Sequence, residues 1–194
     1  MSTPKRLVVG ISGASGAILG IELLQAMQLF PDWETHLVVS SGARRTIALE
    51  TAWTLDAVAA LATRFHPIAD VGALIASGSF RTSGMVVAPC SMKTVAGVAT
   101  GYADNLLLRA ADVTLKERRK LVLVARESPL SAVHLRNLQT VSDLGAVVLP
   151  PVLTFYNRPT CIEDMTRHIV GKILDVFDLE LPGFRRWGDG PEGA

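Results

Sequence analysis

Small and hydroxyl-bearing residues follow the first apolar run of the chain. Residues 6–11 read RLVVGI and residues 12–16 read SGASG, after which apolar residues recur at helical spacing. This order predicts a strand, a tight turn and a helix. The first N–H groups of a helix lack partners within it, and the helix dipole is positive there, so the turn could hold a phosphate. An ordinary glycine-rich turn that closes a βα unit is the alternative interpretation.

The same turn has neither the GxGxxG spacing of dinucleotide sites nor the lysine of GxxxxGK[ST]. A phosphate here would be held by backbone and hydroxyl groups, which suits a mononucleotide such as FMN. Residues 89–94, PCSMKT, form a similar strand-to-helix junction and predict a second helix N-terminus beside the first. Cys90 in this segment has no histidine near it in sequence, so we interpret it as a buried structural thiol.

Arg126 directly follows the apolar run 121–125. A guanidinium at the end of a buried strand is costly unless it meets a carboxylate or a phosphate, so Arg126 is a candidate anion ligand. The neighbouring run 116–120, KERRK, is typical of a solvated helix end, and we expect most of its charges, Arg119 among them, to be exposed.

Glu50 lies in the otherwise apolar stretch 47–53. A buried carboxylate can carry protons in a reaction, whereas an exposed helical glutamate is the ordinary alternative. The four histidines are scattered and show neither HxxxH nor HExxH spacing. We therefore predict no metal site and no Ser-His-Asp triad.

Strand and helix patterns alternate along nearly the whole chain, and the predicted strands lack polar alternation. We predict an α/β fold with a doubly wound, flavodoxin-like or Rossmann-like parallel sheet in one domain, 1–194, with loose ends at 1–5 and 188–194. Ligands of such sheets bind beyond the carboxyl ends of the strands. The predicted strands are 6–11, 36–40, 85–89, 121–125 and 146–149, and the predicted helices begin near 17, 42, 54, 92, 105, 130 and 162.

Composition excludes several classes of protein. The chain has 194 residues, 49% hydrophobic and 19% charged, which excludes intrinsic disorder. Nineteen basic and 18 acidic residues leave a net charge of +1, so we expect no nucleic-acid or membrane partner. Two cysteines and no targeting or membrane-spanning segment favour a cytoplasmic protein.

Several segments together resemble the UbiX family of flavin prenyltransferases over residues 6–187. They are GISGASG at 10–16, ETHLVVS at 34–40, SGSF at 77–80, PCSMKT at 89–94, RAADVTLKERR at 109–119, LVLVARESP at 121–129, GAVVLPP at 145–151 and FYNRP at 155–159. The resemblance implies transfer of a dimethylallyl group from dimethylallyl monophosphate to reduced FMN without a metal. The product, prenylated FMN, would serve a UbiD-type decarboxylase. The resemblance also implies a homo-oligomer, a dodecamer.

The resemblance further implies roles for particular residues. Ser15 and Glu50 would manage protons, and Trp187 would cover the site. The residues expected to contact FMN are Gly13, Ala14, Ser15, Ser40, Ser91, Met92 and Arg126. Those expected at or near the prenyl phosphate are Arg109, Lys116, Arg126, Glu127, Tyr156 and Lys172. Two alternatives remain open: a flavin-dependent decarboxylase of the related cysteine decarboxylase class, and a non-catalytic flavin carrier subunit.

Overall fold

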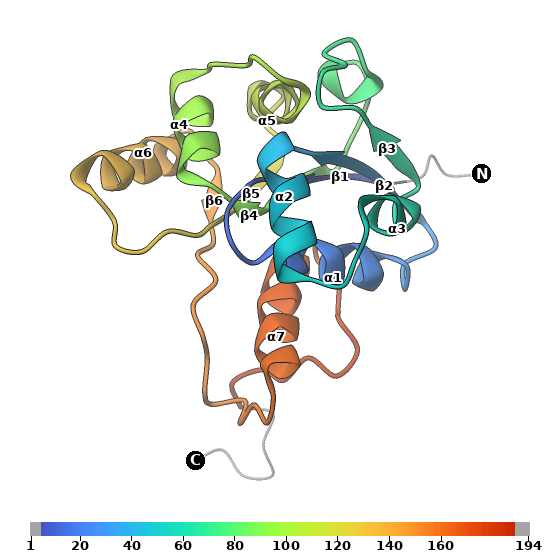
Figure 1. The fold of residues 1–194 in the computed structure, drawn as a ribbon, viewed down its shortest axis with the longest axis vertical. Helices are drawn as coiled ribbons and strands as arrows, with labels where there is room; N and C mark the ends of the chain where they lie inside the picture. Colours follow the sequence, from blue (N-terminus) through green and yellow to red (C-terminus); the bar gives the residue numbers. More distant parts are fainter. Residues whose placement is uncertain (1–4, 189–194) are drawn as a thin grey trace.

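Six parallel strands form one sheet in the order β3-β2-β1-β4-β5-β6 in the computed structural model, which describes residues 5–188 (Figure 1). Because the chain adds β2 and β3 on one side of β1 and then β4, β5 and β6 on the other, the winding reverses between β1 and β4. The strands are β1 (Lys5–Ile11), β2 (Trp33–Val39), β3 (Arg64–His66), β4 (Gly84–Cys90), β5 (Lys120–Ala125) and β6 (Val147–Val148).

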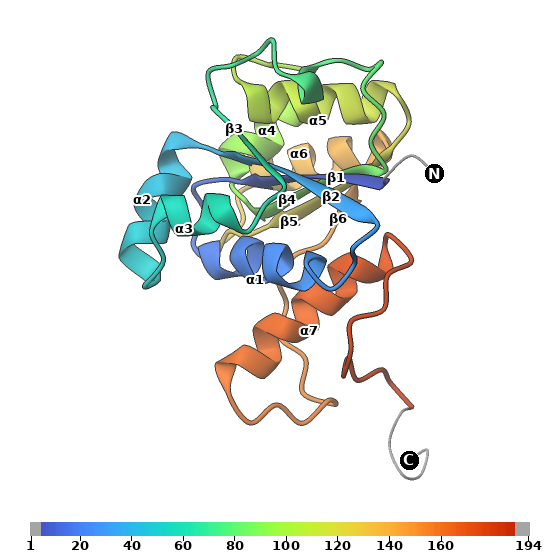
Figure 2. The ribbon, with the colours of Figure 1, turned by 90° about the vertical axis from the view of Figure 1, so that its right-hand side faces the viewer.

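Helices cover both faces of the sheet (Figure 2). They are α1 (Ala17–Met27), α2 (Ser41–Glu50), α3 (Leu55–Ala60), α4 (Met92–Thr100), α5 (Leu106–Lys116), α6 (Ala132–Asp143) and α7 (Ile162–Asp175), with a 3₁₀ turn η1 (Leu74–Ala76). Helices α1 and α7 pack on one face, and α4, α5 and α6 pack on the other. The doubly wound α/β prediction is confirmed.

Continuous apolar runs became central strands, as expected for strands buried on two faces. All seven residues of β4 are buried, and α4 has the predicted bounds. The short edge strand β3 was not predicted, and β6 has two residues where four were expected. Lys5 is the first residue of β1 and pairs with Trp33, so its assignment to a loose end was wrong. Residues 1–4 and 189–194 of the predicted ends lie outside the described residues.

The chain leaves the sheet after β6 in a long segment, 149–161, that runs to the start of α7 (Figure 1). Helix α7 then returns along α1, where the Thr166 hydroxyl donates a hydrogen bond to Glu22 at 2.8 Å. None of the helices between residues 5 and 188 combines the length and the apolar character needed to cross a membrane.

Candidate functional site

Backbone hydrogen bonds join the loops at the carboxyl ends of four neighbouring strands. Ser40 N–H, after β2, donates to Ile11 O at 3.0 Å, and Arg126 N–H, after β5, donates to Cys90 O at 3.0 Å. Between them, Ser12 N–H, after β1, donates to Pro89 O at 3.1 Å. The loops after β2, β1, β4 and β5 therefore form one continuous edge across the point where the winding reverses.

Ser12 makes two further contacts at the centre of this edge. Its hydroxyl donates to Pro89 O at 3.0 Å and accepts from Ser91 N–H at 2.7 Å, and the residue is 1% exposed. Ser12 belongs to the turn after β1, but these contacts could not be predicted from the sequence, because its partners lie 77 and 79 residues away.

The turn after β1 presents backbone N–H groups to its surroundings. Those of Gly13, Ala14 and Ser15 donate to no acceptor among residues 5–188. A Cβ added at Gly13 would lie 3.1 Å from the Cα of Gly42, so this turn and the start of α2 touch through their glycines. Adjacent N–H groups without partners form an anion-binding surface.

Glu50 occupies the start of α1, where the sequence predicted a phosphate. Its Oε2 accepts from Gly16 N–H at 2.8 Å and from Ala17 N–H at 3.1 Å. Helix α1 has no side-chain cap of its own, because its N-cap residue is Gly16 with φ 101°. The carboxylate is exposed, whereas the sequence analysis expected a proton-carrying carboxylate to be buried, and it lies beside the turn that carries Ser15, where it remains accessible for proton exchange. Because Glu50 takes the N–H groups of residues 16 and 17, the N–H groups that remain for an anion are those of residues 13–15.

Two predicted flavin contacts, Ser40 and Ser91, are helix caps. Ser40 Oγ accepts from Ala43 N–H at 3.1 Å at the start of α2, and Ser91 Oγ accepts from Thr94 N–H at 3.3 Å at the start of α4. Met92, the first residue of α4, is 8% exposed. The caps fix the positions of both hydroxyls on the same edge as Ser15.

Arg126 follows β5 at this edge. Its side chain is exposed, and its guanidinium meets no acceptor in the described part of the chain. The neighbouring Glu127 carboxylate accepts from Ser128 N–H at 3.1 Å. Cys90 is 0% exposed, and burial raises the pKa of its thiol, so the prediction of a structural cysteine is confirmed.

Arg109 and Lys116 both lie on α5, Arg109 in its first turn and Lys116 at its end. Arg109 pairs with Asp112 at 2.6 Å and donates to Ala76 O at 3.2 Å, while Lys116 pairs with Glu117 at 2.5 Å. Lys116 ends α5 just before β5 begins, whereas Arg126 follows the end of β5. The six residues of β5, at about 3.3 Å each, separate these positions by about 20 Å. One chain therefore does not bring Lys116 to Arg126.

Arg119, in the basic run 116–120, is not exposed, although the sequence predicted that it would be. Only 15% of its side chain is exposed, and its guanidinium donates to Gly78 O at 2.6 Å and to Phe80 O at 2.9 Å. Arg119 is therefore not solvated but holds the segment before β4 in place. Sequence spacing could not reveal this, because its partners lie 39 and 41 residues away.

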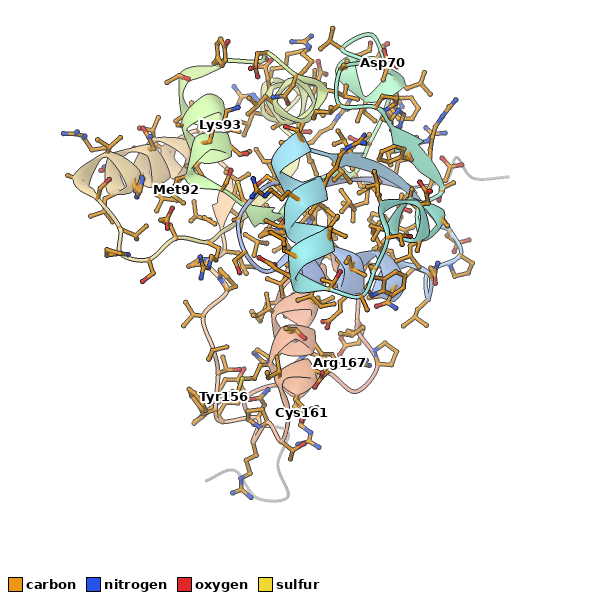
Figure 3. The ribbon with its side chains drawn as sticks, in the orientation of Figure 1. Asp70, Met92, Lys93, Tyr156, Cys161 and Arg167 are labelled. Carbon is orange, nitrogen blue, oxygen red and sulfur yellow. The ribbon has the colours of Figure 1, made fainter. Side chains whose placement is uncertain are left out.

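Tyr156, Lys172 and Trp187 form a third group near α7. Tyr156 Oη lies 3.3 Å from His168 Nε2, and its ring meets that of Trp187 edge-on at 5.3 Å. Lys172 is half exposed and pairs with Asp175 at 3.5 Å. Figure 3 places Tyr156 with Cys161 and Arg167 around the start of α7, away from Met92. Trp187 is 78% exposed, so it does not cover the strand-end edge within its own chain.

Comparison with known proteins decides the family. The model of the Flavoprotein family matches residues 1–179. A probable UbiX-like flavin prenyltransferase of Sedimentibacter hydroxybenzoicus is 55% identical, over 94% of this chain and 96% of its own. This chain belongs to the UbiX-like flavin prenyltransferase family.

Solved structures of the UbiX-like family agree closely with this one. AnUbiX (PadA1), in complex with FMN and dimethylallyl pyrophosphate, is 51% identical with a TM-score of 0.94, covering 97% of this chain and all of that one. A dodecameric FMN-dependent UbiX-like decarboxylase from Escherichia coli O157:H7 is 55% identical with a TM-score of 0.93, covering 94% and 98%. The FMN-dependent cysteine decarboxylase SpaF, at 16% identity and TM-score 0.61, over 75% and 83% of the two chains, shares the fold alone.

The strand-end edge of this UbiX-like chain fits the phosphate of FMN. On this edge the N–H groups of residues 13–15 and the Arg126 guanidinium have no partner within residues 5–188, and each suits an anionic ligand. Among residues 5–188, no three His, Cys, Asp or Glu side chains are grouped so that they could hold a metal ion.

Proposed function

We propose that this chain transfers a dimethylallyl group from dimethylallyl monophosphate to reduced FMN and releases prenylated FMN for a UbiD-type decarboxylase. The observation that carries the proposal is the joined strand-end edge, on which the N–H groups of residues 13–15 and the Arg126 guanidinium lack acceptors within residues 5–188. Family membership supports the same reaction class.

In this proposal the turn after β1 holds the flavin phosphate. The N–H groups of Gly13, Ala14 and Ser15 donate to it, and the capping hydroxyls of Ser40 and Ser91 border it. Met92 lies at the same edge, at the start of α4. Bound FMN would supply the electron-rich ring system to which the allyl group is added.

Arg126 would stabilise the departing phosphate. Cleavage of an allyl phosphate builds negative charge on the leaving group, and a preorganised guanidinium stabilises that charge most strongly in the transition state. Glu127 adjoins Arg126 in the same loop, where its carboxylate is held by the Ser128 N–H. The second bond between the allyl fragment and the flavin would replace a hydrogen of the ring, and the Ser15 hydroxyl would pass the released proton to the Glu50 carboxylate beside its turn.

A second copy of the chain would supply the remaining cations. Lys116 and Arg126 lie at opposite ends of β5, so both can serve one prenyl phosphate only if they come from different copies. Tyr156 and Lys172, near α7, would also reach the phosphate from another copy. Apolar side chains exposed on α6 and its C-cap, on the segment after β6 and at the first residue of α7 support self-association. They are Val133, Leu135, Leu144, Val152, Leu153, Phe155 and Ile162.

A coupled assay tests the proposal, including its last step. The protein is incubated anaerobically with reduced FMN and dimethylallyl monophosphate, protein is removed by filtration, and the filtrate is added to a cofactor-free UbiD-type decarboxylase. We expect decarboxylation only when both substrates were present, and unchanged activation when EDTA is included. A decarboxylase that stays inactive with every filtrate, yet is activated by authentic prenylated FMN, would contradict the proposal.

A further inference from the structure

Ser12 is placed where two strand-end loops meet. Its hydroxyl accepts from the backbone N–H of Ser91 at 2.7 Å and donates to Pro89 O at 3.0 Å. The residue is 1% exposed, so water does not compete for these bonds. One hydroxyl therefore satisfies a donor and an acceptor of the same neighbouring loop.

These bonds set the geometry of the two proposed flavin loops relative to each other. Ser12 directly precedes the N–H groups of residues 13–15, and Ser91 is the N-cap of α4. The backbones of α1 and β4 also approach each other closely at Gly20 of α1, where an added Cβ would lie 2.3 Å from Ala88 O of β4. Backbone packing thus holds the start of α1 against β4. At the outer end the Ser12 N–H also bonds to Pro89 O, and the Ser12 hydroxyl adds the contact that reaches the Ser91 N–H at the start of α4.

We propose that Ser12 is a positioning residue, which fixes the spacing of the 13–15 turn and the 91–94 helix start so that both contact one flavin. This inference rests on the proposed function, because it assumes that FMN binds across these two loops. Ser12 does not itself face the ligand. An alanine would keep the Ser12 N–H bond to Pro89 O but leave the partly buried Ser91 N–H without this acceptor, so that the start of α4 could shift relative to the 13–15 turn.

Thr35 provides a matched control on the opposite edge of the sheet. Its hydroxyl is also buried, at 4% exposure, and also accepts from a distant backbone N–H, that of Thr63, at 3.0 Å. Thr35→Val removes this bond near the amino ends of β2 and β3. Both variants thus lose one buried hydroxyl acceptor, but only Ser12→Ala loses it between the proposed flavin loops.

The experiment measures FMN affinity and stability in the same proteins. Quenching of flavin fluorescence gives the dissociation constant for wild type, Ser12→Ala, Ser12→Cys and Thr35→Val, and thermal unfolding without FMN gives stability. We expect both Ser12→Ala and Thr35→Val to melt earlier than wild type. FMN affinity should fall about tenfold or more in Ser12→Ala and less than about twofold in Thr35→Val. Ser12→Cys, which keeps a weak donor and acceptor, should lie between Ser12→Ala and wild type.

The outcomes separate the two hypotheses. If Ser12→Ala binds FMN within about twofold of wild type, the positioning role is wrong while the proposed function stands. If wild type itself does not bind FMN, the proposed function fails, and this inference fails with it. If Ser12→Ala does not fold, the FMN affinity of Ser12→Cys decides. An affinity equal to that of wild type overturns the inference, and an affinity lower than that of Thr35→Val supports it.

Discussion

The Glu50 carboxylate lies 2.8 Å from the backbone nitrogen of Gly16, so the last residue of α2 caps the first turn of α1. This contact places negative charge at the positive end of the α1 dipole. It also ties a side chain proposed to handle protons to the turn that carries Ser15.

We predict that Glu50→Gln slows product formation at least tenfold while FMN remains bound, because the amide oxygen can still accept from Gly16 N–H but cannot take a proton. Ser15→Ala should likewise slow product formation while FMN remains bound. Single-turnover kinetics and flavin titration measure the two effects separately. Equal loss of flavin from both variants would assign these residues a structural role instead.

Arg126→Ala should lower kcat/KM for dimethylallyl monophosphate about tenfold to hundredfold, since it removes charge-assisted hydrogen bonds worth about 1.5–3 kcal/mol each. Arg64→Ala is the control, because Arg64 is exposed at the start of the edge strand β3, and we expect it to change kcat/KM less than about twofold. Steady-state kinetics with varied prenyl donor tests this ordering, and equal losses in the two variants would contradict it.

Arg119→Ala should destabilise the fold by about 1–3 kcal/mol, because three acceptors of the segment before β4 lose their donor. These acceptors are Gly78 O, Phe80 O and Thr82 Oγ1, at 2.6, 2.9 and 3.3 Å. Urea unfolding followed by circular dichroism measures the loss. Arg118→Ala is unsuitable as a control, since Arg118 has φ 53°. Wild-type stability in Arg119→Ala would show that these bonds contribute nothing.

A buried histidine pair should make stability depend on pH. His36 Nδ1 and His66 Nε2 lie 3.0 Å apart, and burial, with a smaller contribution from His66, lowers the pKa of His36 to about 4. Burial also lowers the pKa of His66. Because the unfolded chain binds protons first, near pH 6.5, stability is complete above that pH and declines as the pH falls towards about 4.

For His36 alone, the loss between pH 7 and pH 5 is about 2 kcal/mol. Urea unfolding at both pH values gives the loss of stability for wild type and for His36→Gln, which lacks the titrating ring. The loss in wild type should exceed that in His36→Gln by this amount. Identical pH dependence in wild type and His36→Gln would refute the assignment.

The sequence allowed prediction of the central sheet more completely than of the site. Strands such as β4 are apolar on both faces and could be recognised from composition alone, whereas β3, with three residues, leaves too short a pattern. The roles of Glu50 and Arg119 depend on partners 33 to 41 residues away, which no local spacing encodes. Arg126 could be proposed from the sequence because its signal is local: a cation at the end of an apolar strand.

The most direct measurement is mass spectrometry of the flavin after anaerobic turnover with reduced FMN. Dimethylallyl monophosphate and dimethylallyl pyrophosphate are supplied in separate reactions, with an Arg126→Ala reaction as control. We predict that wild type with the monophosphate yields FMN heavier by one dimethylallyl group, and that Arg126→Ala yields much less. Recovery of unmodified FMN from wild type with both donors would contradict the assignment of this chain as a flavin prenyltransferase.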